Sequence, residues 1–251
     1  MSETLLPPPL TAPGHLAAQL AAQGYAVLDA ASVCALAGVT SAQLHAWDAD
    51  WATLPPDLYL KDGGRYRRRR HASFVVTGDQ VTRTPHRAHW QPLEYNALHG
   101  GMERWFEPLH DATATQPAWT RLLVWLAGVT ATLRQRPATG PQFVEAHQFR
   151  IDTTDGIGRP TPEGAHRDGV DVVAVFLVSR SDIKGGETRV FDADGPNGQR
   201  FTLTQPWSLM LLDDTRVIHE STPIQPLSGN GHRDTLVVTL RGGGFQEDGA
   251  V

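Results

Sequence analysis

The second half of the chain consists of short runs rich in β-branched and aromatic residues, each separated from the next by turn residues. No pattern with the period of a helix intervenes between these runs. A parallel α/β sheet is therefore excluded, because its strands alternate with helices. The chain instead predicts an antiparallel sandwich or jelly roll. The runs cover residues 142–151, 170–178, 187–191, 199–203, 207–212, 216–219 and 235–241.

The first half of the chain carries the helical patterns. Residues 15–23 indicate a helix that ends at Gly24, residues 25–28 indicate a strand, and two more short helical patterns precede Pro55. Between residues 116 and 136, apolar side chains recur at the spacing of one helix face, which is typical of a helix that packs on a core.

We therefore expect one domain, 1–251, that is mainly β with flanking helices (α+β). In this interpretation residues 138–245 form a jelly-roll core. Residues 1–137 form a buttress of helices and a strand, and they also supply loops at the functional site. Residues 172–178 are apolar at every position, so this strand should be covered on both faces.

Composition narrows the class of protein. The chain has 251 residues, of which 40% are hydrophobic and 20% charged, as in a globular protein with one sizeable core. It has no apolar run long enough for a membrane helix and no signal-peptide pattern, so we expect a cytoplasmic protein without membrane partners. A net charge of -5 argues against nucleic-acid binding, which requires a basic face. The expected partner is a small molecule.

Histidine and aspartate provide the candidate metal ligands. The chain has one cysteine, Cys34, so a metal site must use His, Asp and Glu side chains. Two His-x-Asp triplets occur, His166 with Asp168 and His232 with Asp234. In an extended segment, residues i and i+2 point to the same side, so each pair can present an imidazole and a carboxylate to one ion. Either triplet by itself is a weak signal.

A further histidine distinguishes the first triplet. His219 follows Asp168 by 51 residues, whereas no histidine follows the second triplet. Two imidazoles and one carboxylate leave three positions open on an octahedral ion, which is typical of non-haem Fe(II) oxygenases. Zinc hydrolases are disfavoured because the HExxH motif is missing. A protein-kinase loop is excluded because Val173 stands where the catalytic asparagine is needed.

Several segments together resemble a known family, the 2-oxoglutarate/Fe(II)-dependent dioxygenases. The chain is most similar to the bacterial branch that contains free L-isoleucine hydroxylase and related biofilm-and-stress proteins. The family fold is a double-stranded β-helix, a form of jelly roll, and it agrees with the strand pattern above. The similar segments are 66–74, 94–109, 147–151, 162–173, 184–191, 211–224 and 232–240.

The resemblance implies a set of roles. His166, Asp168 and His219 would bind Fe(II), and Arg233 would pair with the distal carboxylate of the co-substrate 2-oxoglutarate, with O2 as the oxidant. A guanidinium suits the Arg233 role because its planar donors match a carboxylate and it stays charged. Arg241 is the competing candidate on the same expected strand. Halogenating relatives replace the metal carboxylate by a small residue, so Asp168 favours hydroxylation.

A free L-amino acid or a close derivative is the expected substrate. Such a substrate needs a cation for its carboxylate and an anion for its ammonium group. We expect Arg150 and Glu163 to supply them, although ordinary ion pairing would also explain both residues. The arginine run 65–70 is either a solvated face or, by the resemblance, a wall of the site. The segment 99–104 is expected to lie as a loop over its mouth.

Two alternatives remain open at this stage. One is an enzyme of the same chemistry that acts on a protein or peptide, which an exposed long groove would favour. The other is a catalytically silent jelly-roll module that senses metal or 2-oxoglutarate. The three ligand types together with Arg233 favour an enzyme, because a pure binder does not require open coordination positions.

Overall fold

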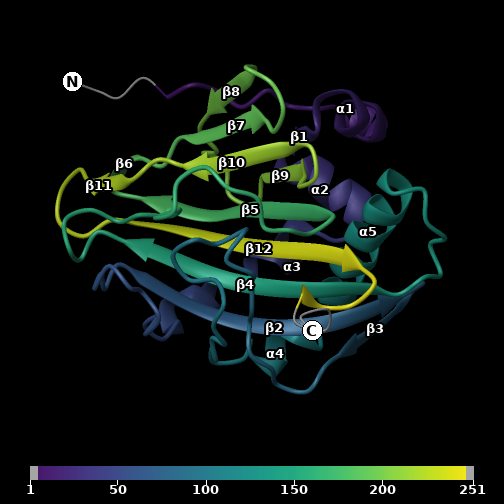
Figure 1. Ribbon diagram of the computed structural model, residues 1–251, viewed down its shortest axis with the longest axis horizontal. Coiled ribbons are helices and arrows are strands. Elements are labelled where there is room, and N and C mark those ends of the chain that lie inside the picture. Colours follow the sequence, from purple (N-terminus) through teal and green to yellow (C-terminus); the bar gives the residue numbers. More distant parts are fainter. Residues whose placement is uncertain (1–4, 247–251) are drawn as a thin grey trace.

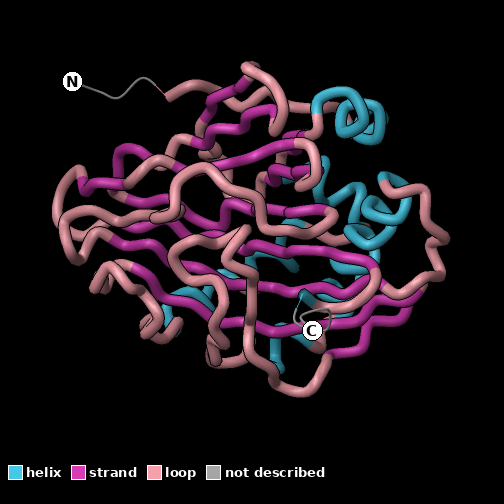
Figure 2. Tube along the Cα trace, in the orientation of Figure 1, coloured by secondary structure: helices cyan, strands magenta, loops and turns pink. Residues whose placement is uncertain are grey.

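The computed structural model describes residues 5–246. Helices gather behind and at one end of a large sheet whose strands cross the whole molecule (Figures 1 and 2). The helices are η1 (Pro13–His15), α1 (Leu16–Gln23), α2 (Ala30–Ala37), α3 (Ser41–His45), η2 (Asp48–Thr53), α4 (Asp111–Ala114) and α5 (Pro117–Leu133).

Antiparallel strands make up the rest of the fold. A seven-stranded sheet has the order β1-β9-β5-β12-β4-β2-β3, a three-stranded sheet the order β10-β7-β8, and β11 pairs with β6. The strands are β1 (Tyr25–Leu28), β2 (Arg67–Thr77), β3 (Gln80–Arg83), β4 (Gln142–Asp152), β5 (Val172–Ser181), β6 (Ile183–Gly185), β7 (Thr188–Asp192), β8 (Gly198–Phe201), β9 (Leu209–Asp213), β10 (Val217–Ser221), β11 (Ile224–Pro226) and β12 (His232–Gly242).

Local sequence signals set the ends of the helices. Helix α1 stops at Gly24, which has a left-handed φ of 71° that a side chain would strain. The Asp29 side chain caps α2 by accepting a hydrogen bond from the backbone N–H of Ser32. Thr40 and Gln43 form a reciprocal capping box at the start of α3. Pro117 occupies the first turn of α5, where its missing N–H costs nothing.

The large sheet separates two kinds of interior. On the face toward the helices, Phe74, Phe176 and Leu236 pack with Trp119 and Leu122 of α5 in one buried cluster. Each such fully buried side chain stabilises the fold by about 1.5–3 kcal/mol relative to an exposed one. The opposite face meets the smaller sheets, with apolar contacts at its β5 and β9 side. Alternate residues of each strand thus face either the helices or the space between the sheets.

The observed elements confirm the mainly β fold with flanking helices. The helices expected at 15–23 and 116–136 are α1 and α5, and all seven expected strand runs are strands. Residues 172–178 are buried throughout, as expected for a strand covered on both faces. The first half of the chain also contributes β2 and β3 to the large sheet, which its arginine-rich sequence did not indicate. Within residues 5–246, no helix is both long and apolar enough to cross a membrane.

Candidate metal centre and active-site pocket

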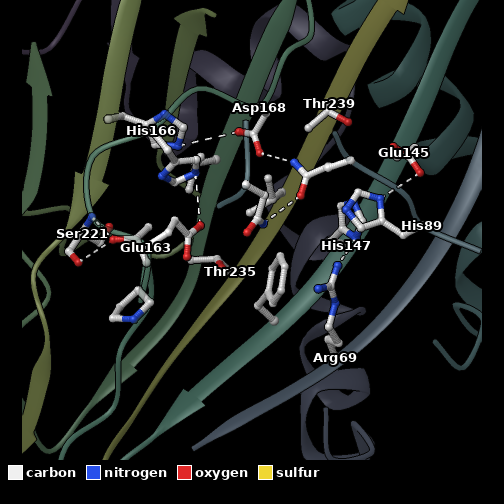
Figure 3. A pocket seen from close by; sticks show the side chains of 18 of the residues that line it. Arg69, His89, Glu145, His147, Glu163, His166, Asp168, Ser221, Thr235 and Thr239 are labelled. Carbon is white, nitrogen blue, oxygen red and sulfur yellow. Dashed lines mark hydrogen bonds and ion pairs between the residues drawn. The ribbon is translucent and has the colours of Figure 1, made fainter. Parts of the chain in front are cut away.

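A cavity of about 130 Å³ lies between the inner face of the large sheet and the segments that carry the two expected histidines. Strand β4 contributes Glu145, His147, Phe149 and Ile151, all of one parity, and β12 contributes Arg233, Thr235, Val237 and Thr239. Figure 3 shows His166 and Glu163 at one end of this cavity and Arg69, His89, Glu145 and His147 at the other.

Three of the expected ligands meet at one end of the cavity. One ligand atom from each of His166, Asp168 and His219 lies within 4.8 Å of the others. The two histidines are held next to each other by a pair of backbone hydrogen bonds between the 166 segment and β10, of 3.1 and 2.9 Å. Oδ2 of Asp168 lies 3.9 Å from Nε2 of His219. The spacing of two in the first triplet therefore places both side chains on the same side, as the sequence indicated.

The hydrogen bond of His166 and the burial of His219 both suit metal binding. Nδ1 of His166 donates to the carbonyl oxygen of Gly164 at 2.9 Å, which leaves the lone pair of Nε2 for another partner. Burial lowers the pKa of His219 well below its usual value, so this imidazole is neutral near pH 7. Burial also lowers the pKa of His166, but the carboxylates of Asp168 and Glu163 outweigh it and raise that pKa.

The segment that carries Asp168 is tied down by its neighbours. Asp214 accepts hydrogen bonds from the backbone N–H groups of Asp168, Gly169 and Val170 at 3.0, 2.7 and 3.0 Å. Nε2 of Gln246 donates to the backbone oxygen of Asp168. Asp214 therefore holds the backbone of this segment and not His219, whose Nδ1 is buried without a hydrogen-bond partner among residues 5–246. Asp213 instead accepts from Thr215 in a turn and pairs with Arg134.

Arg233 is a buried cation that has no protein partner in the described part of the chain. It is 5% exposed, it lines the cavity, and it has no hydrogen-bond or ion-pair partner among residues 5–246. Burial and the nearby Arg180 lower its pKa to about 10, so it remains charged near pH 7. A buried guanidinium of this kind needs an anion, which the cavity can admit. Arg241, the competing candidate, lines a different cavity.

A second group of imidazoles closes the other end. His71, His89, Glu145 and His147 also bring ligand atoms within 4.8 Å of one another. However, Nε2 of His71 and Nδ1 of His89 both donate to Oε1 of Glu145, at 3.0 and 3.1 Å. Nη2 of Arg69 donates to Nδ1 of His147 at 2.7 Å, which occupies that lone pair and adds positive charge. We therefore assign this group to the wall of the cavity rather than to a metal.

Comparison with known proteins bears on the same residues. The family described as 2OG-Fe dioxygenase matches residues 48–239, a span that includes the three candidate ligands and Arg233. The chain belongs to this family. The dioxygenases of this family use Fe(II), 2-oxoglutarate and O2. No curated protein matches the chain.

Solved structures similar to this dioxygenase cover almost its whole length. A bsmA homologue from Methylobium petroleophilum PM1 is 52% identical, covers 98% of this chain and 99% of its own, and has a TM-score of 0.89. IDO from Bacillus thuringiensis is 16% identical, with coverage of 92% and 96% and a TM-score of 0.73. The Fe(II)/α-ketoglutarate-dependent dioxygenase TqaL is 19% identical, with coverage of 94% and 89% and a TM-score of 0.69. The last two similarities support the fold alone.

Arg150 does not face the pocket of this dioxygenase, so the expected substrate contact is wrong. Its guanidinium binds both carboxylate oxygens of Asp234, at 2.8 and 2.7 Å. The reason is parity: odd-numbered residues of β4 line the cavity, and Arg150 lies on the opposite face with Ala146 and Gln148. The second His-x-Asp triplet is not a metal-ligand pair, because its carboxylate, Asp234, is bound by the Arg150 guanidinium.

The arginine run contributes to the pocket in part. Arg67 and Arg69 line the cavity, whereas Arg68, which has the other parity on β2, pairs with Asp152 and has a side chain that is 39% exposed. Both roles considered from the sequence are thus present, separated by the alternation of β2. From the expected 99–104 loop, Arg104 lines the cavity and His99 is buried. His89 and Gln91, which the sequence did not single out, line it too.

Unpartnered polar atoms mark where a ligand can bind. Among residues 5–246, Nη2 of Arg67, Nε of Arg69 and Nε of Arg104 are buried without a hydrogen-bond partner. Oε2 of Glu163 is also buried and unpartnered, and its other oxygen lies 3.6 Å from Nε2 of His166. Buried polar groups without partners are costly. These atoms therefore indicate a ligand that carries both an acceptor and a donor.

Proposed function

We propose that this dioxygenase hydroxylates a small molecule, most simply a free L-amino acid or a close derivative. His166, Asp168 and His219 hold the iron in this proposal, and Arg233 binds the distal carboxylate of 2-oxoglutarate. One observation carries the proposal: a single small cavity combines the three clustered ligands with Arg233, a buried cation that has no partner among residues 5–246. Iron with 2-oxoglutarate and O2 supplies the oxidising power that inserts oxygen into a C–H bond.

The protein's own residues fit the two groups. Two imidazoles and one carboxylate are the donor set of the facial triad, which leaves positions for the keto acid and for O2. Nε2 of His166 is left with its lone pair by the bond to Gly164. Arg233 stands on β12 and lines the cavity, whose lining also includes the apolar side chains of Val175 and Met210.

The opposite charges in the cavity support an amino-acid substrate. Arg69 and Arg104 each have an Nε–H group that lacks a partner among residues 5–246 and can donate to an α-carboxylate. Glu163, which we retain as a proposed substrate contact, offers an unpartnered carboxylate oxygen to an ammonium group. Phe106 and Phe149 sandwich the Arg69 guanidinium at 3.7 and 4.4 Å and hold it in place. Arg69 and Arg104 thus take the role that the sequence had suggested for Arg150.

The size of the cavity favours a free small molecule over a peptide. Its volume of about 130 Å³ is small beside the ~300–1000 Å³ of sites for drug-sized ligands. A peptide hydroxylase would need a long open groove for the residues on each side of the target. The cytoplasmic location expected from the sequence forms part of this proposal, since free amino acids and 2-oxoglutarate are available there.

The test is succinate release. Protein loaded with Fe(II) and given 2-oxoglutarate and O2 should form succinate faster when one of the twenty L-amino acids or their N-acyl forms is present. His166→Ala and His219→Ala should abolish this release, whereas His232→Ala, in the second triplet, should retain it. Triad-dependent succinate release that no amino acid accelerates would contradict the substrate proposal alone. Release that survives both triad variants would contradict the metal assignment.

A further inference from the structure

We propose that Gln91 is a positioning residue that fixes how Asp168 faces the metal and links that carboxylate to Arg104 across the pocket. This inference rests on the proposed metal site at His166, Asp168 and His219. Gln91 is 6% exposed and lies in the loop between β3 and α4. Its Nε2 lies 3.1 Å from Oδ1 of Asp168. Within residues 5–246, it is the only side chain that hydrogen-bonds this carboxylate.

The orientation of the Gln91 amide is fixed by its other partners. Nη2 of Arg104 lies 2.9 Å from Oε1 of Gln91, and a guanidinium can only donate, so that atom must be the oxygen. Nδ2 of Asn96 lies 3.0 Å from the same oxygen. Asn96 is itself oriented, because its Oδ1 accepts from the backbone N–H of His99 at 2.8 Å. The Gln91 amide nitrogen is therefore the atom that faces Asp168.

The backbone holds Gln91 as firmly as its side-chain partners do. The N–H of Gly101 donates to the Gln91 carbonyl oxygen at 2.8 Å. His89 and Arg104 form a pair of backbone hydrogen bonds of 2.9 and 3.0 Å that closes the loop around Gln91. Asn96 and Arg104 are both buried. A side chain fixed at this many points can hold a ligand in one geometry.

This arrangement favours coordination through one oxygen of Asp168. Oδ1 accepts the hydrogen bond from Gln91, while Oδ2 is the oxygen that faces His219, at 3.9 Å from its Nε2. A carboxylate that coordinated through both oxygens would take one of the three positions that the keto acid and O2 require. Asp214 and Gln246 hold only the backbone of this segment, so neither controls the carboxylate plane.

The same bonds connect the two ends of the pocket. Arg104 lines the cavity, and its Nε has no partner among residues 5–246. From its Nη2 two hydrogen bonds lead through the Gln91 amide to Asp168. Hydrogen bonds in such a chain polarise one another. Arg104 therefore acts on the metal carboxylate through Gln91, and among residues 5–246 no other side chain links the two by hydrogen bonds.

Cobalt affinity tests this role. Gln91→Met removes both the donor and the acceptor at nearly constant volume, and we expect Co²⁺ to bind about 10- to 100-fold more weakly than to the wild type. Gln148→Met is the matched control, because it removes a buried glutamine that hydrogen-bonds Asp50 on the other face of the sheet. It should leave Co²⁺ affinity unchanged. Urea unfolding of the two variants compares their stabilities.

A double-mutant cycle separates positioning from general damage. Arg104→Met should weaken Co²⁺ binding in the wild type but have no further effect in the Gln91→Met background, since it acts only through Gln91. Three results would each overturn the inference. Gln91→Met could bind Co²⁺ as tightly as the wild type, Gln148→Met could lose as much affinity as Gln91→Met, or the losses in Gln91→Met and Arg104→Met could add in the double variant. A wild type that binds no Co²⁺ at the triad would overturn it together with the proposed metal site. Triad-dependent Co²⁺ binding without any amino-acid turnover would refute the proposed substrate alone.

Discussion

Acid should destabilise this protein through the imidazole group at the far end of its pocket. Burial lowers the pKa of His89 to about 4, against the opposing effect of Glu145. Burial likewise lowers the pKa values of His71 and His147. All three rings are therefore neutral in the fold near pH 7. In the unfolded chain each ring titrates near its usual pKa of about 6.5.

The sign and size of the effect follow from this difference. Between about pH 6.5 and pH 4 the unfolded chain binds more protons than the folded one, so stability is full above this range and falls as the pH drops through it. For His89 alone, a pKa of about 4 in the fold corresponds to a loss of about 2 kcal/mol in the free energy of unfolding between pH 8 and pH 5. His71 and His147 add to the loss in the same direction.

Urea unfolding at pH 8, 6.5 and 5 measures the effect. His89→Gln keeps an N–H donor for Glu145 but removes the titrating ring, so its free energy of unfolding should fall less steeply with acid than that of the wild type. The exposed His15→Gln should keep the wild-type slope. A wild-type stability that is flat or rises from pH 8 to pH 5 would refute the reasoning, as would an unchanged slope in His89→Gln.

Three substitutions test other parts of the structure. Arg233→Met should raise the KM for 2-oxoglutarate about 10- to 100-fold, because a charged hydrogen bond contributes about 1.5–3 kcal/mol, while Arg241→Met should leave it unchanged in the same succinate assay. Arg150→Met should lower the free energy of unfolding by about 1–3 kcal/mol by leaving Asp234 without its cation, with no change in KM; a change in KM would return Arg150 to the site. Gly24→Ala should destabilise the fold by at least about 1 kcal/mol in urea, since the added Cβ lies 2.7 Å from a neighbouring side chain at a positive φ; equal stability would contradict the capping argument.

Much of the fold follows from local patterns in the sequence. The strands of the second half show continuous or alternating apolar residues, and helix α5 has a clear apolar face with a proline at its start. The sequence did not predict strand β2, because four consecutive arginines, 67–70, mask the alternation of polar and apolar residues that marks a strand. Only the structure shows that Arg67 and Arg69 face a pocket while Arg68 and Arg70 face outward from it. Because all four residues are arginines, the sequence cannot show which of them face the pocket.

The candidate site, like the fold, could be predicted from the sequence only in part. His166 and Asp168 could be paired from a spacing of two, and His219 added, because these rules need no knowledge of strand pairing. Arg150 was predicted on the wrong face of its strand. The alternation of a strand shows which residues share a face, but not which of the two faces lines the pocket. The pocket-lining face depends on the register between β4 and β12. Gln91 and Arg104 come from a loop without periodicity, so nothing in the sequence brings them together.

The central claim is that two imidazoles and one carboxylate share an ion beside Arg233. Anomalous diffraction from crystals grown with Mn²⁺ and 2-oxoglutarate under anaerobic conditions tests it most directly. The account predicts one strong peak about 2.0–2.3 Å from His166, Asp168 and His219, with the far carboxylate of the keto acid on Arg233. A peak at the His71, His89 and His147 group instead, or triad side chains too far apart to share the ion, would contradict it.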